Sequence, residues 1–370
     1  MNERIAASRA NEESYYLASQ WQLMWRKFRR HHLALVGGVI LSLLYLASLG
    51  ADFIAPYAHN ELYEHIHHPP SRIRFLHEGR LVGPFVYGVT DTFDREAYQS
   101  VYTEDRSVRY RVRLFARGAP YRFAGLFPSR LHLFGAEAPG TVFLFGTDTL
   151  GRDLFSRTVH ASRISLSIGL VGVALSFVIG TALGGLSGFY GGRVDTFVQR
   201  CIEFLISLPT IPLWMALAAA LPQEWSVLQL YFGIVIILSL VSWGGLARVV
   251  RGKLLELREH DFVMAAQIGG MRELTIIRRH LLPSFASYLI VHLTLAIPRM
   301  ILAETALSFL GLGLRSPALS WGVLLQRAQN FRSVAIYPWL LIPAAFVIIT
   351  VMAFNFVGDG LRDAADPYKQ

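Results

Sequence analysis

Residues 261–283 read DFVMAAQIGGMRELTIIRRHLLP and form a charged stretch between two long apolar segments. The flanking segments, residues 228–250 and 285–313, are each long enough to cross the roughly 30 Å hydrocarbon core of a membrane as a helix. Charged side chains are costly at membrane depth, so the charged stretch belongs outside the bilayer. We therefore predict a membrane protein in which residues 251–283 form a loop at one membrane surface.

The overall composition agrees with a membrane location. The 370 residues are 53% hydrophobic and only 16% charged, with a mean hydropathy of +0.39 and a formal net charge of +9. A basic excess can serve nucleic acid or an anionic lipid surface; its position beside apolar segments favours lipid, and we expect no nucleic-acid partner. Cys201 is the only cysteine, which excludes an internal disulfide and a cysteine-based zinc site.

Six apolar segments have the length expected of a transmembrane helix: residues 33–55, 164–186, 204–221, 228–250, 285–313 and 335–357. The first could be a cleaved signal peptide, but its apolar run exceeds the usual length of about 7–15 residues and no small-residue cleavage site follows. Pro209, Pro212 and Pro298 predict helices packed inside a bundle, where neighbours satisfy the freed backbone groups. Gly180 and Gly184 allow two helices to approach closely. The predicted fold class is an all-α polytopic membrane protein.

The distribution of arginines predicts the orientation. The basic end of residues 1–32, the loop with Arg193 and Arg200, and residues 251–283 fall on one side of the membrane, whereas the loop at 222–227 has no Lys or Arg. The basic side is cytoplasmic by the positive-inside rule. Six spans then place both the N-terminal segment and the tail, residues 358–370, in the cytoplasm.

Residues 56–145 separate the first two spans, and we expect them to form a β-rich insert outside the cytoplasm. Residues 109–117 alternate between polar and apolar, and residues 72–76 and 81–87 are further strand candidates joined by a turn at 77–80. A histidine-rich patch near the start lacks the spacing of a zinc site, so we predict a polar linker and no metal site. The patch comprises His59, His65, His67 and His68, with Glu61 and Glu64 between them.

A patterned turn, GTDTLGRD at residues 146–153, precedes the second span and opens the helical core at residues 146–357. Asp148 can cap a short helix start, and Gly151 can adopt a positive φ. Arg152 with Asp153 can lock the turn by charge-assisted hydrogen bonds. Taken alone, this pattern predicts an ordered turn.

The charged stretch predicts a short helix that stands off the membrane. The helix can run from Asp261 to about Gly270, where the glycine ends it, and Pro283 fits the first turn of the next span. Arginines around it hold the helix near the lipid surface. A groove on a soluble partner could receive its small, flat apolar face, which comprises Phe262, Ala265, Ala266 and Gly269.

Several motifs in this chain resemble those of one known family. The pattern in the charged stretch comprises Ala265, Ala266, Gly270, His280, Leu282 and Pro283. The other motifs are residues 146–153, GFYGGRVD at 188–195, ETALSFLGLG at 304–313 and DAADP at 363–367. Together they resemble the ABC importer permeases of the dipeptide/oligopeptide/nickel family, specifically the C-type subunit, with the charged stretch similar to the family's EAA coupling loop.

This resemblance implies a type I importer permease fold with six transmembrane helices. The implied coupling residues are Asp261, Met264, Ala265, Ala266, Gly269, Gly270, His280, Leu282 and Pro283. Met264 stands where the family's loop carries a glutamate, so we expect docking to depend on the apolar face and the arginines around it. The implied family motif before the second helix comprises Gly146, Thr147, Asp148, Gly151, Arg152 and Asp153.

The resemblance also implies partners in a bacterial inner membrane. These are a B-type permease in a heterodimer, two cytoplasmic ATPase subunits that bind ATP and Mg, and an extracytoplasmic substrate-binding protein. The chain has no G-x-x-x-x-G-K-[ST] motif, so we expect no cofactor on it and no enzymatic activity of its own. A peptide is the expected substrate. A secondary transporter, or a membrane receptor or sensor with an extracytoplasmic ligand domain, is the alternative function.

Glu304 is an ionisable residue inside the segment 285–313, and such residues tend to face a cavity or a partner. We expect it to line the translocation path, in preference to a structural pair with Arg299. Arg299, Pro209 and Pro212 are further candidates for the path.

Overall fold

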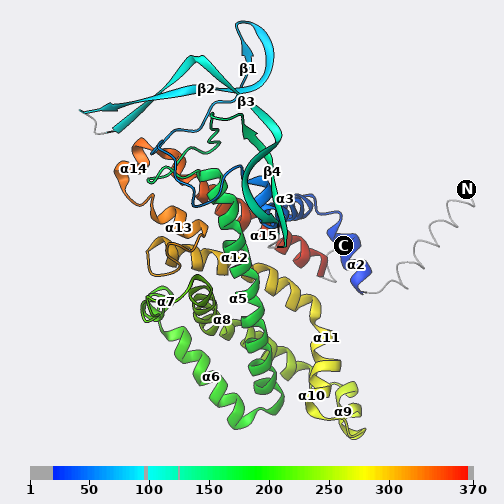
Figure 1. The fold of residues 1–370 in the computed structure, drawn as a ribbon. Coiled ribbons are helices and arrows are strands. Elements are labelled where there is room, and N and C mark those ends of the chain that lie inside the picture. The colour runs from blue at the N-terminus through cyan, green and yellow to red at the C-terminus, as the bar shows by residue number, and fades with distance from the viewer. Residues whose placement is uncertain (1–19, 96–98, 124–125, 366–370) are drawn as a thin grey trace, which may run out of the picture.

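The protein is a bundle of helices that carries a β-sheet at one end (Figure 1). The computed structural model describes residues 20–95, 99–123 and 126–365. The helices are α2 (Gln20–Phe28), α3 (His32–Leu49), α4 (Ala51–Ile54), α5 (Leu154–Tyr190), α6 (Gly192–Ser207), α7 (Thr210–Ala219), α8 (Val227–Leu257), α9 (Asp261–Ile268), α10 (Glu273–Ile276), the π-helical turn η1 (Ile277–Leu281), α11 (Leu282–Ser284), α12 (Ala286–Phe309), α13 (Trp321–Gln326), α14 (Phe331–Ile336), the 3-10 turn η2 (Pro338–Leu341) and α15 (Ile342–Ala365).

Five helical segments in the described part of the chain are long and apolar enough to cross a membrane. They are α3, α5, α8, α12 and the segment Pro338–Ala365. Each overlaps a predicted span, although α5 begins ten residues earlier than residue 164 because the capped turn before it starts the helix. Pro298 is buried within α12, in agreement with the prediction that its helix packs inside a bundle.

The segment expected to be the third span is not one continuous helix. α6 and α7 meet at an angle of 90°, and counting this bent pair as one span brings the total to six. Leu208 at the break is extended, with φ −88° and ψ 136°, because a following proline disfavours helical backbone. Pro209 and Pro212 are exposed in this chain, so its own helices do not enclose them, and their packing inside a bundle stays a prediction.

α5 and α8 pack along a row of small residues. A Cβ atom added at Gly184 would lie 2.4 Å from the carbonyl oxygen of Ala247, and one at Gly180 would lie 3.0 Å from that of Trp243. The two backbones can meet this closely only because these side chains are absent. The predicted close approach at Gly180 and Gly184 is therefore confirmed, and α8 is the partner helix.

α15 holds the N-terminal helices of the described chain. Both α2 and α3 contact α15, and a Cβ at Gly37 of α3 would lie 2.6 Å from the carbonyl oxygen of Ala353. His31 Nε2 and Asp363 Oδ2 are 4.0 Å apart, so α2 and the end of α15 lie close together. Residues 1–19 of the N-terminal segment and 366–370 of the tail, including the last two residues of the DAADP motif, lie outside the described residues.

The insert contains an antiparallel sheet of four strands in the order β1 (Arg74–His77), β2 (Arg80–Asp94), β3 (Gln99–Phe123) and β4 (Phe127–Ala136). β1, β2 and β3 overlap the three predicted strands, although β2 and β3 extend well beyond them and β4 was not predicted. β1 and β2 are joined by a turn with positive φ at Glu78 and Gly79. The insert is closed at its base. There Ser71 N donates to Phe143 O at 2.8 Å, and Phe143 N donates to Ser71 Oγ at 3.0 Å.

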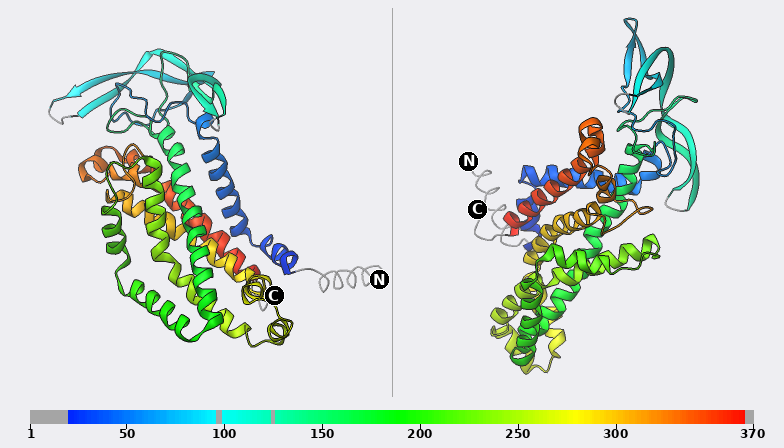
Figure 2. Two further views of the ribbon diagram at one scale, coloured as in Figure 1. Left: turned by 60° about the horizontal axis from the view of Figure 1, so that its bottom comes forward. Right: turned by 90° about the vertical axis from the view of Figure 1, so that its left-hand side faces the viewer.

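The sheet and the short helices of the charged stretch occupy opposite ends of the molecule (Figures 1 and 2). α5 begins beneath the sheet and ends beside α6, while α8 ends beside α9. Both views of Figure 2 also show α2 and the end of α15 away from the sheet. The membrane-crossing helices therefore separate two functional surfaces.

Candidate coupling surface and transmembrane cavity

α9 is a short helix with a defined end. Gly270 has φ +71°, and it donates its N–H to Gln267 O at 3.0 Å while Met271 N donates to Ala266 O at 3.1 Å. This pair of bonds is the Schellman arrangement, which favours glycine at the left-handed position. The prediction that Gly270 ends the helix is confirmed.

One face of α9 is anchored, and the other is open. Val263 and Ala266 are buried against a cluster that includes Leu254 of α8 and Ile276 of α10. Ala266 therefore does not belong to the open face as expected, because its small side chain packs inward. The open face carries larger apolar groups instead, namely Phe262, Met264, Ala265, Ile268 and Met271.

Ile268 is 88% exposed, which is unusual for a large apolar side chain in the last turn of a helix anchored on its opposite side. Met264, at the position where the resemblance implies a glutamate, is exposed beside it. Gly269 and Asp261 are also exposed. The structure thus brings most of the predicted coupling residues to one surface. It adds the exposed side chain of Ile268, which the sequence analysis did not single out.

An ion pair holds the base of this surface. Arg251 of α8 pairs with Asp195 at the start of α6, and Arg251 Nη2 donates to Asp195 Oδ2 at 2.5 Å. Ser187 Oγ of α5 donates to Asp195 Oδ1 at 2.6 Å. This carboxylate ties together three helices, and the sequence signal for it was the acidic end of the motif at residues 188–195.

His280, Leu282 and Pro283 lie where the charged stretch joins α12. His280 is half-buried in η1, and Pro283 occupies the first turns of α11, as predicted for a proline at a helix start. A cavity of about 1110 Å³ opens between this segment and α5. Its lining includes Leu282, Pro283, Arg278 and Arg279. These residues therefore connect the coupling surface to the bundle.

A second cavity, of about 400 Å³, lies within the bundle between α5, the bent pair α6–α7, α8 and α12. Polar groups from four elements line it: Ser176, Thr210, Ser242, His292 and Arg299. Thr210 follows the break at Pro209, so the bend places a hydroxyl-bearing residue at the cavity wall. This cavity is the best candidate for a substrate path within the chain.

Glu304 does not line that cavity. Its exposed fraction is 0%, and its Oε1 accepts hydrogen bonds of 2.7 Å from Ser308 Oγ and Ser320 Oγ. It forms no ion pair with Arg299, which faces the cavity instead. The expectation of a path-lining Glu304 is therefore corrected: α12 turns this side chain toward the loop before α13, where the two serines hold it.

The turn before α5 is locked by a carboxylate other than the predicted one. Asp148 Oδ2 accepts from Arg152 Nε at 2.9 Å and Oδ1 accepts from Leu150 N at 2.8 Å, whereas Asp153 Oδ2 caps α5 by accepting from Ser156 N at 2.8 Å. Gly151 has φ +72°, as predicted. Arg152 therefore pairs with Asp148 rather than with Asp153, because Asp153 is committed to the helix N-terminus.

The same turn clamps the start of the insert. Thr147 Oγ1 accepts from His68 N at 2.7 Å and donates to His65 O at 2.5 Å, while Trp339 Nε1 donates to Thr147 O at 3.2 Å. Gly146 has φ +75°, and a Cβ there would lie 2.4 Å from the carbonyl oxygen of His68. The motif therefore fastens the linker of the insert to α5 and to the start of the last span.

The histidine patch makes ring contacts in this linker. His67 stacks on Tyr337 with centroids 3.9 Å apart, and His68 packs against Tyr102 and Phe143. Within the described residues, no group of three or more His, Cys, Asp or Glu side chains is placed to hold a metal ion. The linker is thus a packed aromatic segment rather than a solvated one.

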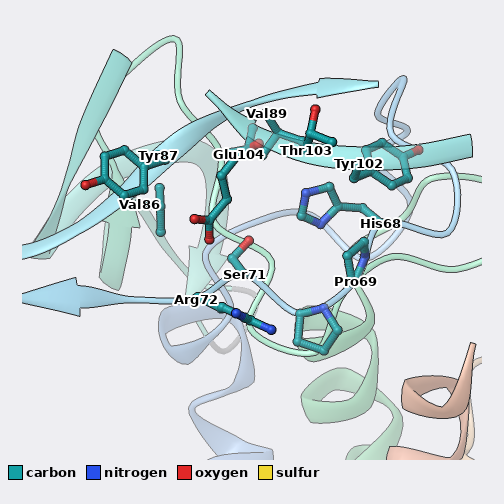
Figure 3. Close-up of a pocket in the computed structure, with 12 residues that line it drawn as sticks. His68, Pro69, Ser71, Arg72, Val86, Tyr87, Val89, Tyr102, Thr103 and Glu104 are labelled. Atoms are coloured by element: carbon teal, nitrogen blue, oxygen red, sulfur yellow. The ribbon is translucent and has the colours of Figure 1, made fainter. Parts of the chain in front are cut away.

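The insert has a pocket of about 640 Å³ beside His68 (Figure 3). The linker contributes Arg72, and strands β2 and β3 contribute Tyr87 and Glu104. Burial lowers the pKa of His68 to about 4, so its imidazole is neutral at physiological pH. Arg74 forms an ion pair with Glu104 at 2.8 Å and neutralises its charge. The pocket therefore offers a ligand the neutral imidazole of His68 and the exposed guanidinium of Arg72.

These features define a polytopic membrane permease: a bundle of apolar helices, an internal cavity, and a short anchored helix on a charged loop outside the bundle. The chain belongs to the family described as the binding-protein-dependent transport system inner membrane component, whose profile matches residues 180–369. A second profile, the N-terminal transmembrane domain of oligopeptide transport permease C, matches residues 19–70. The chain is thus a permease subunit of an ABC importer, and most of the insert lies between the two matches.

Individual relatives agree with this assignment. The dipeptide transport system permease protein DppC of Bacillus subtilis (strain 168) is 39% identical over 231 residues, which cover 62% of this chain and 70% of that protein. The oligopeptide transport system permease protein OppC of Escherichia coli (strain K12) is 42% identical over 224 residues, covering 60% and 72%. Among solved structures, the inward-facing MetNI methionine ABC transporter matches with a TM-score of 0.45 and 18% identity, over 57% of this chain and 97% of that one.

Proposed function

We propose that this chain is the C-type subunit of a peptide importer and pairs with a B-type permease. In this proposal two cytoplasmic ATPase subunits bind ATP and Mg, and an extracytoplasmic binding protein delivers the peptide. The observation that carries the proposal is α9, a helix anchored by Val263 and Ala266 that presents Phe262, Met264 and Ile268 outward. An exposed apolar helix face fits a groove on a soluble partner.

The coupling is mechanical. A partner can shift the bundle between two states only if it holds the coupling helix differently in each. α9 is suited to transmit such a force because its inner face packs on α8 and α10, and α8 in turn packs closely on α5. A displacement of α9 would therefore reach the cavity through the helices that line it.

The arrangement of the two surfaces supports the proposed orientation. α9 and the loop between α5 and α6 lie at one end, where the arginine-rich loops predict the cytoplasm. The sheet lies at the other end, outside the cytoplasm, where its pocket beside Arg72 is accessible to a binding protein. The ends of α2 and α15 lie away from the sheet, which supports cytoplasmic termini in the inner membrane.

A peptide is the substrate that the cavity and the relatives favour. Arg299 and His292 line the cavity, and a guanidinium is the side chain best suited to a carboxylate such as a peptide terminus. The names of the two relatives, a dipeptide and an oligopeptide transport permease, point to the same class.

The contact between α9 and an ATPase subunit can be tested with Ile268→Asp. A carboxylate at the centre of an apolar contact must be desolvated on docking, so we expect ATPase recruitment to membranes to weaken at least tenfold, a loss of about 1.4 kcal/mol or more. Leu81→Asp is the matched control, because Leu81 is 79% exposed but lies in the sheet at the opposite end. Equal recruitment by both variants would refute the proposed surface.

Uptake assays in proteoliposomes that contain the assembled transporter distinguish the alternative functions. Peptide uptake should require ATP and both ATPase subunits and should persist when the proton and sodium gradients are dissipated. Uptake driven by an ion gradient without ATP would indicate a secondary transporter. Binding of a ligand to the insert without any uptake would indicate a receptor or sensor.

A further inference from the structure

The β3–β4 hairpin bends from the sheet toward the membrane-crossing helices (Figure 2, right). His132 is buried, and its two ring nitrogens lie 2.6 Å from Ala55 O and 3.0 Å from Ala119 O. Phe134 of β4 packs edge-on against Phe155 of α5. The hairpin is therefore fixed to the point where the chain leaves the first span and enters the second.

The outer surface of this hairpin is apolar. Leu126 is 73% exposed, and Phe123 and Phe127 form the last described pair of the two strands. The exposed large apolar side chains of the hairpin are Leu114, Phe115, Phe123, Leu126, Phe127 and Leu131. Other parts of the insert also expose large apolar side chains, but the hairpin holds its six beside the membrane-crossing helices, which favours an apolar neighbour.

Three arginines accompany these apolar side chains. Arg117, Arg122 and Arg130 are exposed, and none forms an ion pair within the described residues. Arginine beside exposed aromatic and aliphatic groups is typical of the membrane interface, where the stem contacts lipid tails and the guanidinium contacts phosphate.

A cavity of about 690 Å³ joins this hairpin to the transmembrane helices. The cavity is lined by Arg122 of the hairpin, by Tyr45 and Leu49 of α3, and by Leu166 and Leu170 of α5. Leu170 lies six residues beyond residue 164, where the predicted span begins, or about 9 Å along the helix, so the cavity extends into the outer part of the hydrocarbon region. The groove is therefore apolar below and has a guanidinium at its mouth.

The other polar groups of the cavity leave Arg122 as its unneutralised charge. Arg163 is committed to Asp52, with Nη2 donating to Oδ2 at 2.8 Å, so these two charges cancel. The buried hydroxyl of Tyr45 has no hydrogen-bond partner in the described chain. The cavity thus offers one free positive charge and one unsatisfied hydroxyl above an apolar groove.

We propose that the hairpin contacts the outer leaflet and that Arg122 binds the phosphate of a phospholipid whose acyl chain lies in the groove between α3 and α5. Lipid fits this surface because the groove runs along two helices that themselves cross the membrane, and because its charge is complementary to a phosphate. The insert is then a peripheral membrane element as well as an extracytoplasmic one. This site is independent of the transported substrate and of the coupling surface.

Spin labels can locate the hairpin in the assembled transporter in phospholipid nanodiscs. Cys201 is the only cysteine of this chain, so Cys201→Ala, assembled with partner subunits whose own cysteines are replaced, gives a background for single labels at Phe127→Cys and Leu81→Cys. The label at 127 should be more accessible to oxygen than to a water-soluble nickel chelate, and the label at 81 should show the reverse. A label at 127 that behaves like the one at 81, or that is shielded from both reagents by a protein partner, would overturn the proposal.

The phospholipid itself can be counted by native mass spectrometry of the detergent-solubilised transporter. Arg122→Glu should lose one retained phospholipid per chain, because it places a carboxylate against the phosphate. Arg72→Glu is the matched control, since Arg72 is also exposed but lines the pocket in the sheet. An unchanged phospholipid count in Arg122→Glu, or an equal loss in both variants, would contradict the site even if peptide uptake requires ATP as proposed.

Discussion

Gly269 and Gly270 are adjacent but have different backbone conformations. Gly269 has φ −69°, which any residue adopts, whereas Gly270 has φ +71°. A side chain in the left-handed region costs about 1–2 kcal/mol, and more when it is β-branched. The end of α9 therefore depends on the second glycine alone.

This difference predicts that Gly270→Val abolishes peptide uptake and the stimulation of partner ATPase activity while membrane insertion continues. The strained residue would unwind the last turn of α9 and displace Ile268 from its place. Transport assays and ATPase assays on the same membranes measure the effect.

Gly269→Ala serves as the control for that substitution. A Cβ at position 269 would lie 3.3 Å from Ala265 O, a close contact that a small shift relieves, so uptake should stay within about twofold of the wild type. Normal uptake by Gly270→Val would show that the end of the helix is not part of the coupling surface.

Asp148 and Asp153 lie in one turn, but their pKa values shift in opposite directions. Burial opposes ionisation of Asp148, yet hydrogen bonds from Arg152 and Leu150 and the charge of Arg157 hold its pKa below the usual value. Burial raises the pKa of Asp153 to about 7, since no cation compensates it. The folded protein therefore binds a proton at Asp153 that the unfolded chain, with a pKa near 3.9, releases at lower pH.

The stabilising effect of that proton is fully present below about pH 4 and is lost as the pH rises through about 7. We expect Asp153→Asn to flatten the fall in melting temperature between pH 5 and pH 8, measured in detergent micelles. The variant should be more stable than the wild type at pH 8, by on the order of 1 kcal/mol or more, because each pKa unit corresponds to about 1.4 kcal/mol and the amide oxygen can still cap Ser156 N.

Asp148→Asn provides the contrast. It removes the charge that compensates Arg152 and Arg157, so it should lower the melting temperature at both pH values. A wild-type protein that is equally stable at pH 5 and pH 8 would contradict the assignment for Asp153.

Some of these residue-level features could be predicted from the sequence, and others could not. The positive φ at Gly151 and Gly270 followed from the unique conformational freedom of glycine. The partner of Arg152 could not be predicted, because both aspartates lie within reach and only the helix start decides which one is free. The direction of Glu304 likewise depended on Ser320, which lies sixteen residues away along the chain.

At the scale of elements, the packing of α5 on α8 depends on glycines that let the two backbones approach closely. A Cβ at Gly184 would lie 2.4 Å from Ala247 O, which is backbone and cannot move aside. Gly184→Ala should therefore force the helices apart and cost about 1–3 kcal/mol, as overpacking commonly does. Thermal unfolding in mixed micelles measures the loss.

The next residue gives an internal comparison. At Gly185 the nearest atom to an added Cβ is Ile277 Cγ2 at 3.8 Å, an ordinary contact distance. Gly185→Ala should leave the melting temperature within about 1–2 °C of the wild type, because it adds contact without overlap. A similar loss in both variants would contradict the assignment to the close approach at Gly184, because alanine has the higher helix propensity and cannot by that route cause a loss.

The bent pair α6–α7 shows what periodicity cannot reveal about an element. Residues 204–221 are apolar throughout, which predicts a span, but apolarity does not distinguish a straight helix from a broken one. Pro209 with the extended Leu208 was the local signal for the break. The bend matters because it places Thr210 and Trp214 at the cavity wall.

At the scale of the whole molecule, the sequence predicted the parts better than their contacts. Five of the spans, three of the four strands and the short helix at the charged loop depended on local patterns, and each overlaps the segment that those patterns indicated. The position of the β3–β4 hairpin, which brings Arg122 into one cavity with Arg163, could not be predicted. It depends on a hydrogen bond between His132 and Ala55, which are 77 residues apart in the sequence.

The base of the insert has a consequence for whether its sheet can be exchanged. Ser71 and Phe143 are hydrogen-bonded neighbours, and the turn at Thr147 fastens the linker beneath them. The whole sheet therefore leaves and re-enters the permease at a single point, so a sheet of another size or sequence could be exchanged there without moving a transmembrane helix.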